Sequence, residues 1–304
     1  MRLPLVTHPA YAAPLPEGHR FPMAKFQLLA EHLRRLDLLT PERLHCPQPV
    51  PRRWLELVHP RGYHEAFARQ RLSSAEARRI GLPATPAVVR RSWLAVGGTV
   101  LTARLALRHG LACHLAGGTH HAFGTAGSGF CIFNDVAVAA RVLLNEGLVR
   151  RLLVVDLDVH QGDGTAALFS GEPRVFTFSA HAASNFPLRK GRSDLDLPLP
   201  DGLEDQPYLA AVAAVLPDLL SQVRPDLVLY NAGVDPHRQD RLGRLCLTDG
   251  GPLQRERMVL EICLQQRVPV ATVIGGGYDA LAPLVERHGL VVRAAAEVGR
   301  LHRL

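Results

Sequence analysis

The sequence contains very little lysine, since Lys25 and Lys190 are the only two among its 304 residues. Its positive charge comes mostly from arginine, which is scattered along the chain and leaves a formal net charge of +7. A dense basic tract interleaved with aromatic residues, which a nucleic-acid surface favours, is missing. We therefore expect a solvated, arginine-rich surface without direct nucleic-acid binding, and an acidic or tail-like protein substrate stays open.

Paired cysteines and long apolar runs are also missing. The five cysteines are widely spaced and form no CxxC pair, which favours reduced thiols in a cytoplasmic protein over disulfides or a cysteine–zinc site. The beginning of the chain has no basic head followed by an apolar stretch, so we expect no secretion signal. No apolar run approaches the roughly 20 residues that a membrane span needs.

Short runs of valine, isoleucine and leucine alternate with longer amphipathic segments. The runs that we predict as buried strands are 111–116, 152–156, 175–180, 227–231 and 268–274. The predicted helices cover about 92–109, 135–148, 206–223, 250–266 and 278–288. This alternation predicts an α/β fold in which helices cover both faces of a mostly parallel central sheet, giving three layers. No break divides the chain, so we expect one domain over residues 1–304.

Unusual polar residues follow the predicted strands at their carboxyl ends. They are Asp156, Asp158, His160, Ser179, His181, Asn231, Asp235, Tyr278 and the pair His120–His121. In open parallel sheets this edge is where ligands bind. We therefore expect these distant segments to meet at one site.

Asp158 and His160 are two residues apart at the end of a predicted strand, and Asp235 follows another strand. Two carboxylates and an imidazole suit Zn²⁺, and three protein ligands leave a position open for catalysis. The same ligands could also hold Fe²⁺. A single Asp-x-His motif is common in proteins that bind no metal. Several acids at one buried edge, however, would be costly without a cation.

Three further residues predict hydrolytic chemistry beside this metal site. His120 and His121 can exchange protons near neutral pH and stabilise developing charge, with Asp156 and Asp163 available to orient their rings. Tyr278 follows three glycines, and its hydroxyl could stabilise an oxyanion. Each of these residues alone has an ordinary structural explanation, as a loop histidine or a core tyrosine.

Together, these motifs resemble those of the zinc-dependent histone deacetylase family, which has the arginase–deacetylase fold. The matching segments, in family order, are 117–122 (GGTHHA), 129–135 (GFCIFND), 156–164 (DLDVHQGDG), 231–235 (NAGVD) and 275–278 (GGGY). Thr119, the segment 18–23 (GHRFPM) and the segment 240–243 (DRLG) are similar to a class IV-like subgroup. The resemblance covers roughly residues 5 to 280.

The resemblance implies a role for each matching residue. Asp158, His160 and Asp235 would bind zinc. His121 would be the main general base and acid, and Tyr278 would polarise the acyl carbonyl. The supporting residues would be His120 with Asp156 beside it, and Asp163 beside His121.

The resemblance also implies a channel and a structural cation. Gly129, Phe130 and Phe186 would line a channel for an acyl-lysine, although Phe130 and Phe186 on their own read equally well as core residues. A monovalent cation, usually K⁺, would bind the backbone oxygens of Asp156, Asp158, His160 and Ala180 and the Ser179 hydroxyl. A second such site would lie near Phe169 and Val175. Arg20 would lie near an inner cavity for the released acid.

The function expected from these residues is hydrolysis of N-acyl amide bonds, most of all on lysine side chains of proteins. An alternative is a deacetylase of small acylated amines, such as acetylpolyamines or a biosynthetic intermediate. A binding protein with a vestigial site is a third interpretation. An arginase-type two-metal enzyme is disfavoured, because positions 162 and 237, where it needs bridging aspartates, are Gly and His.

Overall fold

A computed structural model describes residues 3–304. Its centre is one eight-stranded sheet with the strand order β2-β1-β3-β8-β7-β4-β5-β6, and every neighbouring pair is parallel. In chain order the strands are β1 (Leu5–Val6), β2 (Leu44–His45), β3 (Leu111–His114), β4 (Leu152–Asp156), β5 (Val175–Ala182), β6 (Leu195–Leu199), β7 (Leu227–Asn231) and β8 (Val270–Val273). The carboxyl ends of β3, β8, β7, β4 and β5 therefore lie next to one another.

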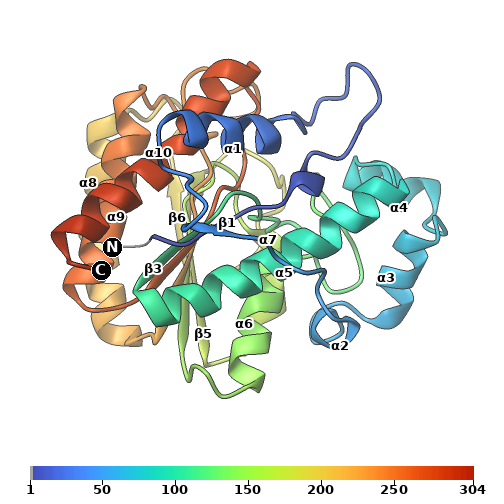
Figure 1. Ribbon diagram of the computed structural model, residues 1–304, viewed down its shortest axis with the longest axis horizontal. Coiled ribbons are helices and arrows are strands. Elements are labelled where there is room, and N and C mark those ends of the chain that lie inside the picture. Colours follow the sequence, from blue (N-terminus) through green and yellow to red (C-terminus); the bar gives the residue numbers. More distant parts are fainter. Residues whose placement is uncertain (1–2) are drawn as a thin grey trace.

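Helices cover both faces of the sheet (Figure 1). One layer contains α5 (Pro86–His109), α6 (Asp135–Asn145) and α7 (Asp163–Phe169). The other contains α1 (Lys25–Arg35), α8 (Asp205–Val223), α9 (Gly250–Gln265) and α10 (Leu281–Leu301). Three short helices, α2 (Arg52–Leu55), α3 (Arg61–Ala68) and α4 (Ser74–Ile80), lie beside the α5 layer, and a 3₁₀ turn, η1, covers Pro9–Tyr11.

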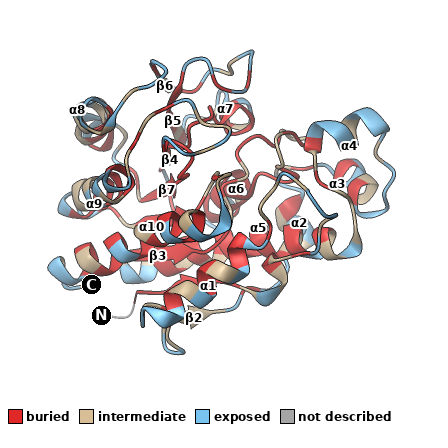
Figure 2. Ribbon diagram, turned by 90° about the horizontal axis from the view of Figure 1, so that it is seen from above, coloured by how far each residue is buried: buried red, intermediate tan, exposed pale blue. Residues whose placement is uncertain are grey.

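The alternation of side chains along the strands explains the three layers. Leu152 and Val154 of β4 pack into a core cluster with α5 and α6, whereas Leu153 and Val155 pack into the larger cluster on the other side. Successive strand residues point to opposite faces, so a strand with two covered faces must be apolar throughout. Figure 2 shows the central strands in the colour of buried residues, with exposed residues on the outer helices and loops.

Local signals fix several helix boundaries. Thr85 caps the first turn of α5 by accepting a hydrogen bond from the Val88 amide, and Pro86 stands at the first helical position. Asn134 caps α6 in the same way through the Ala137 amide. This cap fixes the direction in which the chain leaves the loop 117–133, which carries the two histidines of the site.

The structure confirms the predicted fold class and all five predicted strands, with ends that shift by up to two residues. The predicted helix 278–288 instead begins at Leu281 and continues to Leu301, so Tyr278 lies in the preceding loop. The predicted elements did not include β1, β2, β6 or helices α1–α4 and α7, which are short or carry mixed polarity. No helix of the described residues is long and apolar enough to cross a bilayer, and all five cysteines are free thiols.

Candidate active site

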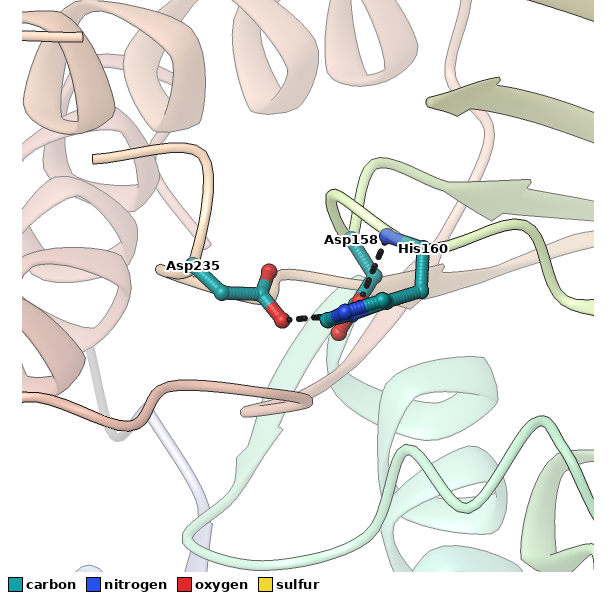
Figure 3. Close-up of side chains that lie close together, drawn as sticks. All are labelled: Asp158, His160 and Asp235. Atoms are coloured by element: carbon teal, nitrogen blue, oxygen red, sulfur yellow. Dashed lines mark hydrogen bonds and ion pairs between the residues drawn. The ribbon is translucent and has the colours of Figure 1, made fainter. Parts of the chain in front are cut away.

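Two carboxylates and one imidazole converge at the carboxyl edge of the sheet (Figure 3). Nδ1 of His160 lies 3.1 Å from Oδ1 of Asp158 and 3.1 Å from Oδ2 of Asp235. One ligand atom from each of these residues lies within 4.8 Å of the others, and all three residues are buried. The loops after β4 and β7 bring them together, because these two strands are neighbours in the sheet. The structure thus places the three predicted metal ligands at one point.

Backbone N–H groups orient the two carboxylates. Asp158 accepts hydrogen bonds from the amides of His160 (3.0 Å) and Gly276 (2.7 Å), and Asp235 accepts one from the amide of Val159 (2.9 Å). Gly276 approaches so closely that a Cβ atom there would lie 2.1 Å from Oδ2 of Asp235. The glycine run after β8 therefore allows the backbone to reach the carboxylates.

This donor set fits a divalent cation. Burial and the neighbouring Asp158 carboxylate raise the pKa of Asp235 to about 7, so two negative charges at this place oppose each other. A cation between them would remove that conflict. One nitrogen and two oxygens are ligands that zinc accepts, and three protein ligands are typical of catalytic sites.

Each of the two adjacent histidines is paired with its own buried aspartate. Nδ1 of His120 lies 2.7 Å from Asp156, and Nδ1 of His121 lies 2.7 Å from Asp163. The two imidazole centroids are 4.1 Å apart, and the His121 ring is 5.9 Å from that of His160. Each carboxylate keeps a proton on Nδ1 and directs Nε2 toward other partners.

The two histidines differ in their charge preference. Burial lowers the pKa of His121 to about 4, and the neighbouring His120 shifts it in the same direction. Burial would also lower the pKa of His120, but the Asp156 and Asp158 carboxylates outweigh it and raise the pKa to about 9. His121 is thus the neutral member of the pair at neutral pH, able to accept a proton.

An open cavity of about 420 Å³ leads from the surface to His121 and His160. Its lining residues are Arg20, Arg79, His121, Ser128, Gly129, Phe130, His160, Asn185, Phe186, Leu242 and Tyr278. The Tyr278 ring lies 6.3 Å from that of His160, and the Phe186 ring lies 4.9 Å from that of His121. All three residues predicted for the channel therefore line one cavity, together with Tyr278.

Gly129 lines this cavity and has a φ of +52°. A Cβ atom at this position would lie 2.8 Å from the His121 ring and 3.4 Å from the Phe186 ring. Its backbone conformation also belongs to the left-handed region that favours glycine. A larger residue would therefore narrow the path toward His121.

A comparison with known protein families matches residues 19–292 to the histone deacetylase domain. The chain belongs to the histone deacetylase family. Membership makes it a hydrolase of the deacetylase type. The matched range contains every predicted site residue, from His120 to Tyr278.

Two relatives differ in how much of their own length is similar to this chain. An uncharacterized protein of a Picosynechococcus species is 56% identical over 299 residues, which are 98% of this chain and 100% of that protein. The acetoin utilization protein AcuC of Staphylococcus aureus is 31% identical over 254 residues, which are 76% of this chain but 65% of that protein. The similarity to the first protein thus extends over nearly all of the residues compared.

Solved structures show the same fold. A crystal structure of a histone deacetylase homolog from Aquifex aeolicus superposes with a TM-score of 0.86 and 25% identity, covering 98% of this chain and 84% of that one. A crystal structure of a histone deacetylase homolog complexed with SAHA gives a TM-score of 0.86 at 26% identity over the same shares.

A second and smaller cavity of about 30 Å³ borders the site of this deacetylase. Its lining includes His120, Asp158 and Arg91, and we call it the inner cavity and the larger one the outer cavity. Arg91 is buried and stacks its guanidinium on Phe26 at 4.5 Å. Arg20, expected by resemblance near such a cavity, instead lines the outer cavity. The sequence did not single out Arg91, because it stands one residue before the predicted helix 92–109, at a place where arginines are ordinary surface residues. In the structure it is a buried residue of α5.

Two further buried cations hold the backbone around the site. Lys25 donates hydrogen bonds to the carbonyls of Gly275 (3.3 Å) and Gly277 (3.4 Å), and burial lowers its pKa to about 8. Arg255 of α9 donates to the carbonyl of Leu157 (3.0 Å) and to that of Gly233 (2.7 Å). Leu157 precedes Asp158, and Gly233 is two residues before Asp235. Arg255 therefore joins the two segments that carry the ligands.

The residues predicted for a monovalent cation also lie side by side. Asp156 of β4 and Ser179 of β5 are register partners, and Asp158, His160 and Ala180 follow directly along the same two segments. The Ser179 hydroxyl lies 2.9 Å from Nδ1 of His181. The K⁺ assignment stays a prediction, as does the second site near Phe169 and Val175.

Proposed function

We propose that this chain is a zinc-dependent hydrolase that removes acyl groups from amines, most of all from lysine side chains of proteins. The observation that carries the proposal is that three residues able to hold a metal ion lie beside two histidine–aspartate pairs, and that one cavity reaches His121, His160 and Tyr278. Membership of the deacetylase family supports it. We further propose that residues 1–304 act as a single catalytic domain.

Asp158, His160 and Asp235 would hold the metal. A bound zinc ion would supply Lewis-acid chemistry, polarising the acyl carbonyl and favouring deprotonation of water. Fe²⁺ could bind the same donors. K⁺ at Asp156, Asp158, His160, Ser179 and Ala180 would stabilise the backbone from which two of the ligands project.

The protein side chains would carry out the proton transfers. His121, neutral and oriented by Asp163, would accept a proton from the attacking water. The Tyr278 hydroxyl would donate a hydrogen bond to the oxyanion that forms on the substrate. His121 or His120 would then protonate the leaving amine, giving a free amine and a carboxylate.

The cavity would position the substrate for this reaction. Phe130 and Phe186 would flank the apolar stem of an acylated lysine, and Gly129 would leave room for it beside His121. A flat, apolar passage of this kind favours an alkyl chain that carries its amide to the base of the cavity.

A second candidate is a deacetylase of small acylated amines. The 31% identity to a protein named for acetoin utilization supports this second candidate, since that name refers to the metabolism of a small molecule. A panel of acyl-lysine peptides of different acyl length, measured against acetylpolyamines with the metal content of the same sample, separates the two candidates.

Substitution Tyr278→Phe tests the proposed mechanism. It should lower turnover of an acyl-lysine substrate by about 10²–10³-fold while zinc content stays unchanged. Tyr11→Phe is the matched control, because its hydroxyl bonds to His114 at 2.7 Å and Tyr11 lines neither cavity. Full activity of the Tyr278→Phe protein would exclude the oxyanion role.

A further inference from the structure

The mouth of the outer cavity carries positive charge without acidic partners. The outer cavity is the one of about 420 Å³ that reaches His121. Four of its lining residues come from segments distant in sequence, and we call them the mouth: Arg20, Arg79, Phe186 and Leu242. Within residues 3–304, none of the residues that line this cavity is an aspartate or a glutamate. A cationic amine that enters it therefore meets two guanidinium groups and no counter-charge.

Arg79 is held in place at this mouth. Its Nε donates a hydrogen bond to the carbonyl of Gly127 at 3.1 Å, and its own carbonyl accepts one from the amide of Gly129 at 3.1 Å. The terminal nitrogens of its guanidinium have no hydrogen-bond partner among the described residues. The nearest acid along its helix, Glu76, is instead engaged by the capping box with Ser73. Arg79 thus presents a guanidinium that is oriented beside the channel glycine, forms no ion pair and is offset only by the more distant charge of Glu76.

Arg20 lines the same cavity and is flanked in sequence by two residues that contact Phe130. Its neighbours His19 and Phe21 pack their rings at 6.3 Å and 5.4 Å from that of Phe130. Its side chain forms no hydrogen bond or ion pair within the described chain, and the adjoining groove adds Arg241, which is also unpaired there. The one acid that lines this groove, Asp279, is neutralised by Arg287 at 2.6 Å.

We propose that the enzyme selects acylated amines that carry a carboxylate at the end of the alkyl chain opposite the acylated nitrogen, as acyl-lysine does, and that Arg79 and Arg20 are the specificity-determining residues. This inference rests on the proposed function of the same cavity. A guanidinium binds a planar carboxylate through two parallel hydrogen bonds, which fits a fixed Arg79. Acetylpolyamines and lysine-rich tails, which bring positive charge to the mouth, are disfavoured by repulsion.

Three probes of different charge test the proposal, and the first two differ in charge alone. They are Nε-acetyl-lysine with a benzoylated α-amine and a free carboxylate, the corresponding carboxamide, and the carboxamide with a free α-amine. We expect KM to rise in this order by about threefold to tenfold per step at low salt, with kcat nearly constant, and the differences to shrink as salt is added. A peptide with Asp or Asn next to the acetyl-lysine distinguishes a neighbouring acidic side chain from a free α-carboxylate.

The variants Arg79→Gln and Arg20→Gln should remove most of the preference, whereas Arg79→Lys should retain part of it. Arg150→Gln is the matched control, because Arg150 is exposed and precedes β4 at the opposite edge of the sheet. Equal KM values for the three probes, or a preference for the cation, would overturn the proposal.

A binding experiment separates this inference from the proposed function. The same probes are titrated calorimetrically into the zinc-loaded Tyr278→Phe protein, in which slow turnover does not interfere. One outcome is that the Tyr278→Phe protein binds the probes in the expected order of charge while the unmodified enzyme hydrolyses none of them. This outcome would reject the proposed function and retain the proposed specificity. Turnover without charge preference would reject the specificity alone, and the loss of both would reject both.

Discussion

The floor and the mouth of the cavity are built in different ways. We call Asp158, His160 and Asp235 the floor. Its side chains are buried, come from the ends of two central strands and receive backbone hydrogen bonds. At the mouth, Phe186 is 42% exposed, and Arg20 is exposed with no side-chain partner in residues 3–304. If the floor serves the reaction and the mouth the choice of substrate, as we propose, changes at the two places should affect different kinetic constants.

The largest effect is expected from a change in the floor. Asp158→Asn replaces a carboxylate oxygen by an amide N–H₂ group that faces donors, including the amide of Gly276. Zinc content per chain should fall to near zero, and turnover should become undetectable, because one of three ligands is lost. Metal analysis and an activity assay on the same sample check this. Retained zinc in the variant would contradict the ligand assignment.

An intermediate effect is expected from the support below the floor. Arg255→Met removes the hydrogen bonds to the carbonyls of Leu157 and Gly233 and leaves the buried Glu256 with the Tyr230 hydroxyl but no cationic partner. We expect zinc affinity to weaken by about 10–100-fold, as measured by competition with a chelator. Arg255→Lys should recover part of the loss. A fall in thermal stability with unchanged zinc affinity would show that Arg255 has no part in spacing the ligands.

The smallest effect is expected at the mouth. Phe186→Ala should raise KM for an acyl-lysine peptide by about threefold to tenfold and leave kcat and stability nearly unchanged, because an aromatic contact contributes about 0.5–1.5 kcal/mol. Leu188→Ala is the control, since Leu188 is on the same loop and is 93% exposed. A kcat effect as large as that of a floor variant would remove the distinction between the two regions.

The fold and the floor were predictable from sequence because both depend on short-range patterns. Apolar runs marked the strands, and Asp158 and His160 stand directly at the end of one of them. Residues that act through packing were not predictable in this way. Lys25 and Arg255 lie on helices and resemble surface residues in composition.

A periodic signal was nevertheless present for both. Lys25 shares a helix face with the buried Leu29 and Leu33, and Arg255 is one turn before the buried Val259. A basic residue at an inward position of an amphipathic helix indicates a buried partner. The identity of that partner, however, required the three-dimensional arrangement, because the carbonyls of Gly275 and Leu157 belong to distant segments.

The scarcity of lysine has a practical consequence. Lys25 is buried with its ammonium bound to two carbonyls, and the ammonium of Lys190 donates to the carbonyls of Asn185 and Pro187. Neither lysine of the described chain therefore presents a free amine to reactive acyl donors. An enzyme that removes acyl groups from lysine would be a poor substrate for itself, and amine-directed dyes or crosslinkers should label it weakly, whereas the exposed thiol of Cys46 offers a handle.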